Sequence, residues 1–183
     1  MIGKLVKWTS SIIRMLLLKM RYRDRFIVDM KEIKKPPYIG KRVSICVEKG
    51  CKLILMGGDV SDDCQIVVMD GANAVIGKKV YLGKGCRIFV RKDFCIGSYT
   101  LLADNVSIYD HNHRFRDKKR PIARQGYSSA PVSIGSNCWL CTNVVVTKGS
   151  KIEDGVIVGA NAVVNGICKM DCVYKCSDLI VVQ

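Results

Sequence analysis

The chain has 183 residues and a formal net charge of +14, because 30 Lys and Arg residues outnumber 16 Asp and Glu residues. This length is enough for one domain with a substantial hydrophobic core. We expect no nucleic-acid binding, because the basic residues accompany neither a recognised nucleic-acid motif nor a set of stacking aromatic residues. No uncharged segment approaches the roughly 20 residues that span a bilayer, and no small-residue cleavage site follows the N-terminal apolar run. We therefore expect neither a transmembrane helix nor a signal peptide.

The first 35 residues carry half of the net charge. Ten Lys or Arg residues stand there against three acidic residues, which gives +7 (10 − 3). Residues 12–18 are mostly apolar and are flanked by Trp8 and by basic residues, a pattern that predicts a basic amphipathic helix. Two roles remain open for this helix. It caps one end of the fold, or it also attaches reversibly to the anionic inner surface of a membrane.

Repeating coils begin near Ile39-Gly40. Between about residues 46 and 75 the spacing of aliphatic residues is irregular, and turn-prone pairs such as Gly57-Gly58 and Asp70-Gly71 interrupt it. We expect flatter and less regular coils over residues 46–75.

A six-residue period governs the chain after residue 75, with one two-residue insertion and one longer break. Helices repeat at 3.6 residues and open strands at 2, so neither produces a sustained period of six. The period predicts a solenoid with three short strands per turn, in which each strand places one aliphatic side chain inside and small residues occupy the corners. The aliphatic positions are Ile76, Leu82, Ile88, Ile96, Leu102, Ile108, Ile134, Leu140, Val146, Ile152, Val158 and Val164.

A solenoid of this kind leaves open ends and flat faces that need to be covered. Because the faces around a triangular prism are alike, they favour self-association into a cyclic homotrimer.

Both histidines of the chain lie in the longer break of the ladder. His111 and His113 follow Asp110, and the segment 110–130 that contains them is polar and strongly basic. A rigid solenoid with one excluded loop is expected to carry functional residues on that loop. Neither histidine falls on an apolar face, so a structural role in the core explains them less well. A neutral imidazole accepts a proton near neutral pH, as the activation of a hydroxyl nucleophile requires.

Ten cysteines without a secretory signal indicate a reducing cytosol, and hence a cytoplasmic protein. Cys138 and Cys141 have a C-x-x-C spacing, and Cys168, Cys172 and Cys176 recur every four residues, so a zinc or redox site is an alternative. The ladder already explains the first pair as compact apolar side chains, and no histidine accompanies the second set. We therefore expect no metal.

Three segments, YDHNH, SAPVSIGSNCWLCTNVVVTKG and IEDGVIVGANAVV, carry a resemblance to a known family. Residues 75–165, and more loosely 36–75, resemble the bacterial hexapeptide-repeat O-acetyltransferases, especially those that acetylate maltose, galactosides and surface polysaccharides. The resemblance implies an all-β fold, a left-handed parallel β-helix, which is an exception to the right-handed crossover rule. It also implies a trimer with active sites between subunits and acetyl-CoA as the donor.

The expected organisation follows from the helix pattern, the ladder and this resemblance. Residues 1–35 form a basic amphipathic helical segment, and residues 36–183 form a left-handed β-helix acyltransferase domain. The loop at about 110–130 is excluded from the coils.

The resemblance also assigns roles to individual residues. An alignment without gaps places the family's catalytic base on His113, whereas a gap of two residues would place it on His111. The same comparison assigns the oxyanion contact and the acetyl-CoA groove to Thr142, Trp139, Ala160 and Asn165.

Departures from the family pattern concern both substrates. Gly83-Lys84 replaces a rung where sugar-acetylating members often carry Asn, so acceptor recognition there should differ. The histidine loop is slightly longer and more basic, which suits an anionic or larger glycan. The usual C-terminal tail is also replaced, so the lysine that contacts the CoA phosphates would be Lys169 or Lys175. Asp110 is expected to hold a histidine tautomer or to contact the acceptor.

We expect an enzyme that transfers the acetyl group of acetyl-CoA to a hydroxyl of a sugar or lipid-linked glycan during surface polysaccharide or lipopolysaccharide synthesis. An N-acyltransferase acting on an amino sugar would use the same base and donor, and stays open. A serine acetyltransferase would carry a large helical N-terminal domain, and a γ-class carbonic anhydrase would need three histidine zinc ligands. The alternative from another class is a non-catalytic β-solenoid scaffold, which would not bind CoA.

Overall fold

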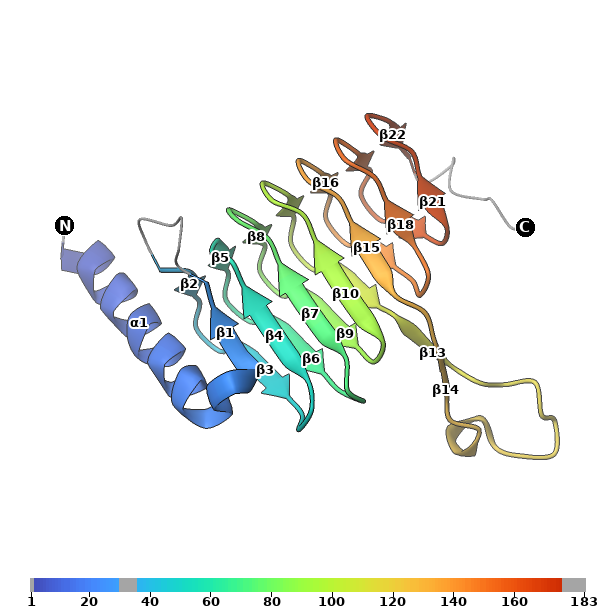
Figure 1. The fold of residues 1–183 in the computed structure, drawn as a ribbon. Coiled ribbons are helices and arrows are strands. Elements are labelled where there is room, and N and C mark those ends of the chain that lie inside the picture. The colour runs from blue at the N-terminus through green and yellow to red at the C-terminus, as the bar shows by residue number, and fades with distance from the viewer. Residues whose placement is uncertain (1, 30–35, 176–183) are drawn as a thin grey trace.

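The computed structural model describes residues 2–29 and 36–175. Its strands wind into a solenoid, with a helix across one end and a hairpin that projects from one edge (Figure 1). Successive turns stack their strands in parallel into three sheets, which makes the coil a triangular prism. Each turn of the chain passes from the first sheet to the second and then to the third, through three corners that we number in the same order.

The first sheet contains β1 (Phe26–Val28), β4 (Lys52–Leu55), β7 (Asn73–Ile76), β10 (Asp93–Ile96), β15 (Val132–Ile134), β18 (Lys151–Ile152) and β21 (Ile167–Cys168). The second contains β2 (Tyr38–Ile39), β5 (Asp59–Val60), β8 (Tyr81–Leu82), β11 (Leu101–Leu102), β16 (Trp139–Leu140), β19 (Ile157–Val158) and β22 (Val173–Tyr174). The third contains β3 (Ser44–Val47), β6 (Gln65–Val68), β9 (Arg87–Val90), β12 (Ser107–Tyr109), β17 (Val145–Val146) and β20 (Val163–Val164).

The aliphatic ladder forms the core, as predicted. All twelve positions from Ile76 to Val164 are buried inside the prism. Parallel pairing places like residues of successive turns on top of one another, as in the stack of Leu102 on Leu140 and Leu140 on Val158. Burial of such a continuous aliphatic column is the main force that holds one turn on the next.

The expectation of flatter, irregular coils over residues 46–75 is wrong. Strands β3, β4, β6 and β7 are four residues long and pair in continuous parallel register. The register advances by 21 residues from Leu53 to Ala74 and by 20 from Ala74 to Phe94, but by 18 from Ser133 to Lys151. Longer turns with longer strands therefore hide the six-residue period without disturbing the coil.

Glycine is required where one corner lies directly on the next. A Cβ atom on Gly97, at the first corner, would lie 2.5 Å from the backbone nitrogen of Ser136 in the following turn. A Cβ on Gly83, at the second corner, would lie 2.6 Å from the carbonyl carbon of Ala103. The glycines that follow ladder residues in the sequence therefore mark backbone contacts between turns.

Helix α1 (Ile2–Tyr22) and the short 3₁₀ turn η1 (Arg23–Arg25) cover the N-terminal end of the coil (Figure 1). The coil also begins earlier than residue 36, because β1 pairs with β4 from Phe26 onwards. Three lysines that contribute to the N-terminal charge, at 31, 34 and 35, lie outside the described residues. Within the described part of the chain, no helix has the length and apolarity that crossing a membrane demands.

Candidate active site

The two histidines lie on a hairpin that leaves the prism at the third corner, between β12 and β15 (Figure 1). Strand β13 (His111–His113) pairs in antiparallel register with β14 (Tyr127–Ser129), and a short 3₁₀ turn, η2 (Ile122–Arg124), lies in the intervening loop. The predicted excluded loop is therefore an ordered arm that rejoins the coil at Val132. Because its base is hydrogen bonded to the coil, the hairpin holds both imidazoles at a defined place on the edge.

Asp110 fixes the base of the hairpin. Its side chain is 1% exposed and accepts the backbone N–H of Arg91 at 2.9 Å and that of Lys92 at 2.7 Å. One carboxylate oxygen also lies 3.0 Å from Nδ1 of His111, whose side chain is 14% exposed. An ionised carboxylate only accepts hydrogen bonds, so the contact favours a proton on Nδ1 of His111 and leaves Nε2 as the acceptor nitrogen.

A stack of side chains connects the two imidazoles to the coil. The ring of Tyr127 lies 4.4 Å from that of His113 and 5.4 Å from that of His111, centroid to centroid. The guanidinium of Arg91 lies 3.8 Å from the Tyr127 centroid and forms an ion pair with Asp70. The sequence analysis did not identify Tyr127 and Arg91 as site residues. They lie far apart in the sequence and come into contact only because the hairpin folds back on the coil.

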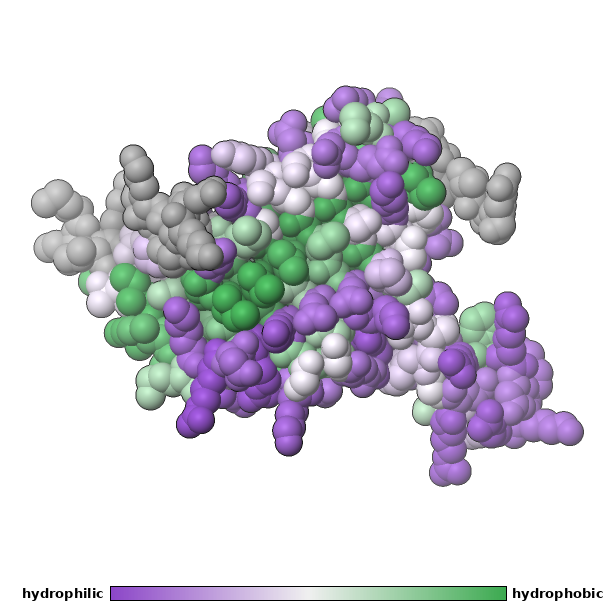
Figure 2. Space-filling view, in the orientation of Figure 1, coloured by the Kyte–Doolittle hydropathy of each residue, from purple (hydrophilic) through white to green (hydrophobic). Residues whose placement is uncertain are grey.

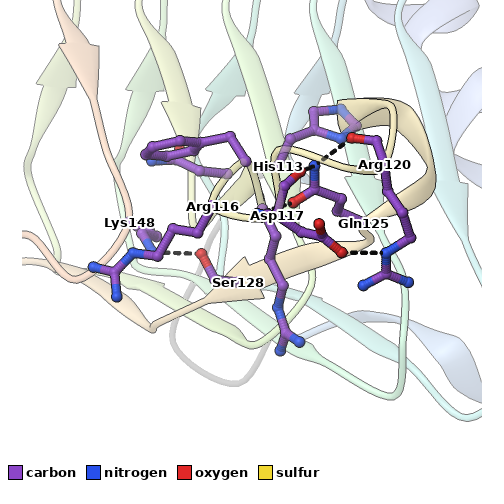
Figure 3. A pocket seen from close by; sticks show the side chains of 10 residues that line it. His113, Arg116, Asp117, Arg120, Gln125, Ser128 and Lys148 are labelled. Carbon is purple, nitrogen blue, oxygen red and sulfur yellow. Dashed lines mark hydrogen bonds and ion pairs between the residues drawn. The ribbon is translucent and has the colours of Figure 1, made fainter.

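A pocket of about 640 Å³ opens along the hairpin, and its lining is strongly cationic (Figure 3). His113 lines this pocket, whereas His111 does not. Arg120 is paired with Asp117 at 2.7 Å, and Lys148, from the coil after the hairpin, donates to Ser128 at 2.6 Å. The cationic side chains in the lining are Arg114, Arg116, Arg120 and Lys148.

The remaining predicted site residues lie on other parts of the prism. Trp139 points outward from the second sheet and is 48% exposed. Thr142 and Ala160 occupy the second corner of successive turns, where the N–H of Asn161 donates to the carbonyl of Thr142 at 3.0 Å. Gly83 and Lys84 lie at the same corner, two turns before Thr142.

Asn165 shares the third corner with the hairpin and accepts the Thr147 hydroxyl at 3.2 Å, whereas Lys169 lies at the first corner. Within one chain the structure thus brings Asp110, His111 and His113 together. It leaves the residues assigned to the acetyl-CoA groove mainly on the second sheet and the second corner.

The cysteines behave mainly as core residues. Cys138 and Cys168 are buried, and burial raises the pKa of both thiols, that of Cys168 to about 11. A protonated thiol is a poor metal ligand and a poor nucleophile. No cluster of three His, Cys, Asp or Glu side chains suited to a metal ion occurs among the residues that the structure describes, and Cys176 lies outside them.

Sequence comparisons point to acetyltransferases. Residues 131–166 match the family model for the bacterial transferase hexapeptide (six repeats). A probable acetyltransferase of Mycobacterium tuberculosis is 40% identical over 90 residues, which cover 49% of this chain and 30% of that protein. WbbJ of Escherichia coli, provisionally assigned as a lipopolysaccharide biosynthesis O-acetyl transferase, is 41% identical over 78 residues, 39% of this chain and 40% of that protein. The match spans less than half the length of these relatives.

Solved structures show the same fold. A maltose O-acetyltransferase from Clostridium difficile aligns with a TM-score of 0.56 at 20% identity, over 93% of this chain and 82% of that chain. A hexapeptide-repeat acetyltransferase from Vibrio cholerae, in complex with acetyl coenzyme A, aligns with a TM-score of 0.54 at 21% identity, over 75% and 64%. The predicted left-handed β-helix is confirmed by this shared architecture. The repeats and the fold are those of hexapeptide-repeat proteins, and the relatives that the chain resembles in sequence are acetyltransferases.

Proposed function

We propose that the chain transfers the acetyl group of acetyl-CoA to a hydroxyl group of a sugar or glycan precursor. The observation that carries this proposal is the histidine hairpin, which presents His113 in a cationic pocket on the edge of a hexapeptide coil. Similarity to WbbJ and to the galactoside O-acetyltransferase of Escherichia coli, 30% identical over 51% of this chain and 45% of that protein, supports a sugar as acceptor. The Vibrio cholerae complex supports acetyl-CoA as donor.

The chemistry requires one base and one oxyanion donor. A neutral imidazole takes the proton of the acceptor hydroxyl while its oxygen forms a bond to the thioester carbonyl carbon. The tetrahedral oxyanion then collapses, the carbon–sulfur bond breaks, and the CoA thiolate leaves and takes up a proton. A backbone N–H near Thr142 would stabilise the oxyanion, and a well-placed base contributes about 10²–10⁴-fold to the rate.

His113 is the proposed base, and His111 is the second candidate. The position of His113 in the pocket lining supports the first choice, because a base must reach the acceptor hydroxyl. The contact between Asp110 and His111 supports the second, because a carboxylate that orients an imidazole is typical of catalytic bases. If His113 is the base, His111 acts on its position through the ring of Tyr127 that both contact.

The acceptor is proposed to be anionic. Arg114, Arg116 and Lys148 surround the same pocket as His113, and Asp117 is the one acidic residue in its lining. Clustered cations favour carboxylate or phosphate groups, which arginine binds with two parallel hydrogen bonds. A uronic or other acidic sugar, or a sugar joined to a diphosphate carrier, has this chemistry.

We also propose that the active form is a homotrimer with active sites between subunits. Support comes from the separation, within one chain, of the histidine hairpin from Trp139 and Thr142 on the second sheet and its corner. Further support comes from an outward column of exposed apolar residues on the second sheet. The column contains Tyr81, Leu101, Trp139 and Val173.

The test of acetyl transfer is CoA release from acetyl-CoA with neutral, amino, acidic and diphosphate-linked sugars. We expect release that depends on an acidic or diphosphate-linked acceptor and falls about 10²–10⁴-fold in His113→Ala. Lys119→Ala is the control, since Lys119 is exposed on the same hairpin but does not line the pocket.

Two results would change the assignment. Equal release by wild type and His113→Ala, with loss only in His111→Ala, would transfer the role of base to His111. The absence of both release and CoA-induced thermal stabilisation would favour the scaffold alternative, because ligand binding to the native state must raise its stability.

A further inference from the structure

Helix α1 has a second apolar face that the coil does not use. Its inner face packs on the first turn, where Met15 and Tyr22 are buried. The outer face carries large apolar side chains that are 39–74% exposed (Figure 2, along the helix at the left). These side chains belong to Val6, Ile12, Ile13, Leu16, Leu17 and Met20.

The geometry of the helix places the centre of the outer face opposite the inner face. At 3.6 residues per turn, Ile13, Leu17 and Met20 fall roughly 180° around the axis from Met15 and Tyr22. Lys19 lies on one border between the two faces and Arg21 on the other, and both are exposed. The helix lies across the end of the solenoid, so its outer face points away from the coil and from the histidine hairpin (Figure 1).

We propose that the outer face of α1 binds the surface of an anionic lipid bilayer. A helix in the plane of the interface buries its apolar face at the boundary between headgroups and acyl chains. Basic side chains along both borders then extend to the phosphates on either side. Lys19 and Arg21 supply this charge complementarity, which a purely apolar protein partner would not require.

The arrangement has a consequence for the whole molecule. With α1 flat on the bilayer and its inner face on the first turn, the solenoid extends from the membrane surface into water. This inference does not depend on acetyl transfer, and it is tested without any enzymatic measurement.

The test is co-sedimentation of the full chain with phosphatidylcholine vesicles that contain or lack phosphatidylglycerol. We expect binding only to vesicles with phosphatidylglycerol. Ile13→Ser/Leu17→Ser should abolish it, because both side chains are more than half exposed and belong to the outer face. Ile122→Ser/Ile167→Ser is the matched control, since it removes equally exposed aliphatic side chains elsewhere and should bind as wild type does.

Charge is tested separately, which keeps the proposal falsifiable if the apolar variant misfolds. Lys19→Glu/Arg21→Glu should lower the vesicle partition coefficient at least about tenfold, whereas Lys118→Glu/Lys119→Glu on the hairpin should not. Three results would overturn the proposal: no binding by wild type, retained binding by the α1 variants, or equal loss in the hairpin variant. A change in oligomeric mass by light scattering in Ile13→Ser/Leu17→Ser, with no vesicle binding by wild type, would instead assign the face to contact between chains.

Discussion

The buried carboxylate of Asp110 ties the hairpin to the preceding turn. It accepts two backbone N–H groups, those of Arg91 and Lys92, and contacts His111. Asp110→Asn keeps the size of the side chain but leaves only one accepting oxygen. One buried donor then loses its partner, so we expect a loss of about 1–3 kcal/mol in the free energy of unfolding. Asp117→Asn removes a partly exposed carboxylate on the same hairpin and should change the free energy of unfolding by less than about 0.5 kcal/mol.

The same substitution discriminates between the two candidate bases. If His113 is the base, the rate of CoA release by Asp110→Asn, measured below its unfolding temperature, should fall by less than about tenfold. The reason is that no contact joins Asp110 to His113, so general base catalysis by His113 persists. A loss as large as that of His111→Ala would show that the oriented imidazole is the base. CoA release and thermal unfolding, measured on the same samples, give both numbers.

The residues of the candidate site could be predicted from the sequence only where they stand out from the six-residue repeat. His111 and His113 stand out because they interrupt a ladder whose other positions are aliphatic or small. Arg91 and Tyr127 do not, because their contact depends on the path of the hairpin. The sequence predicts Asp110 as a partner for an imidazole, but its two backbone contacts depend on how the following turn stacks on Arg91 and Lys92.

Helix α1 provides hydrogen-bond partners to the open edge of the first turn. Ser11 accepts the N–H of Ile39 at 2.7 Å, and Tyr22 donates to the carbonyl of Ile45 at 2.7 Å. Arg14 of the helix donates to the carbonyl of Ile39, and Arg25 of η1, which follows the helix, donates to that of Val47. An uncovered edge would leave these backbone groups exposed to pairing with another chain, so the helix ends the solenoid as a capping element does.

Tyr22→Phe tests this role. The substitution leaves the buried carbonyl of Ile45 without its donor, at a cost of about 1–3 kcal/mol. Because each turn contacts only its neighbours, amide hydrogen exchange should rise in the first and second turns and stay unchanged from β15 onwards. Tyr99→Phe, with an exposed ring, should leave exchange unaltered. A uniform increase along the coil would contradict a local capping role.

Strands could be predicted from the sequence where the six-residue period is regular, and not where it is irregular. From β15 onwards the turns have 18 residues, except the last, which has 16, and the ladder positions up to Val164 are those the sequence marks. On the first sheet the turn from β4 to β7 has 21 residues and shows no period of six, although its strands are as regular in space. The 20-residue turn from β7 to β10 shows the period with one two-residue insertion. The apolar run at residues 12–18 predicts a helix within residues 1–35. It does not predict that Phe26–Val28 joins the first sheet, because a three-residue strand has no period of its own.

The separation of the candidate residues around the prism is the main reason to expect a shared site in the whole molecule. The histidine hairpin leaves from the third corner, whereas Thr142 and Ala160 lie at the second. A donor groove at the second corner would meet a histidine only if a neighbouring prism supplied one. Threefold symmetry would repeat that contact three times and close the assembly.

Mixed oligomers provide a quantitative test of this arrangement. His113→Ala lacks the proposed base, and Ala160→Trp fills the proposed acetyl-CoA groove at an exposed corner position. Each variant alone should be inactive. When they are co-expressed in equal amounts and mix at random, one site in four combines an intact hairpin with an intact groove from the neighbour, so activity should return to roughly a quarter of wild type.

A site built within one chain requires both intact residues in the same subunit, and the mixture would then stay inactive. Light scattering on the same sample shows whether three chains associate.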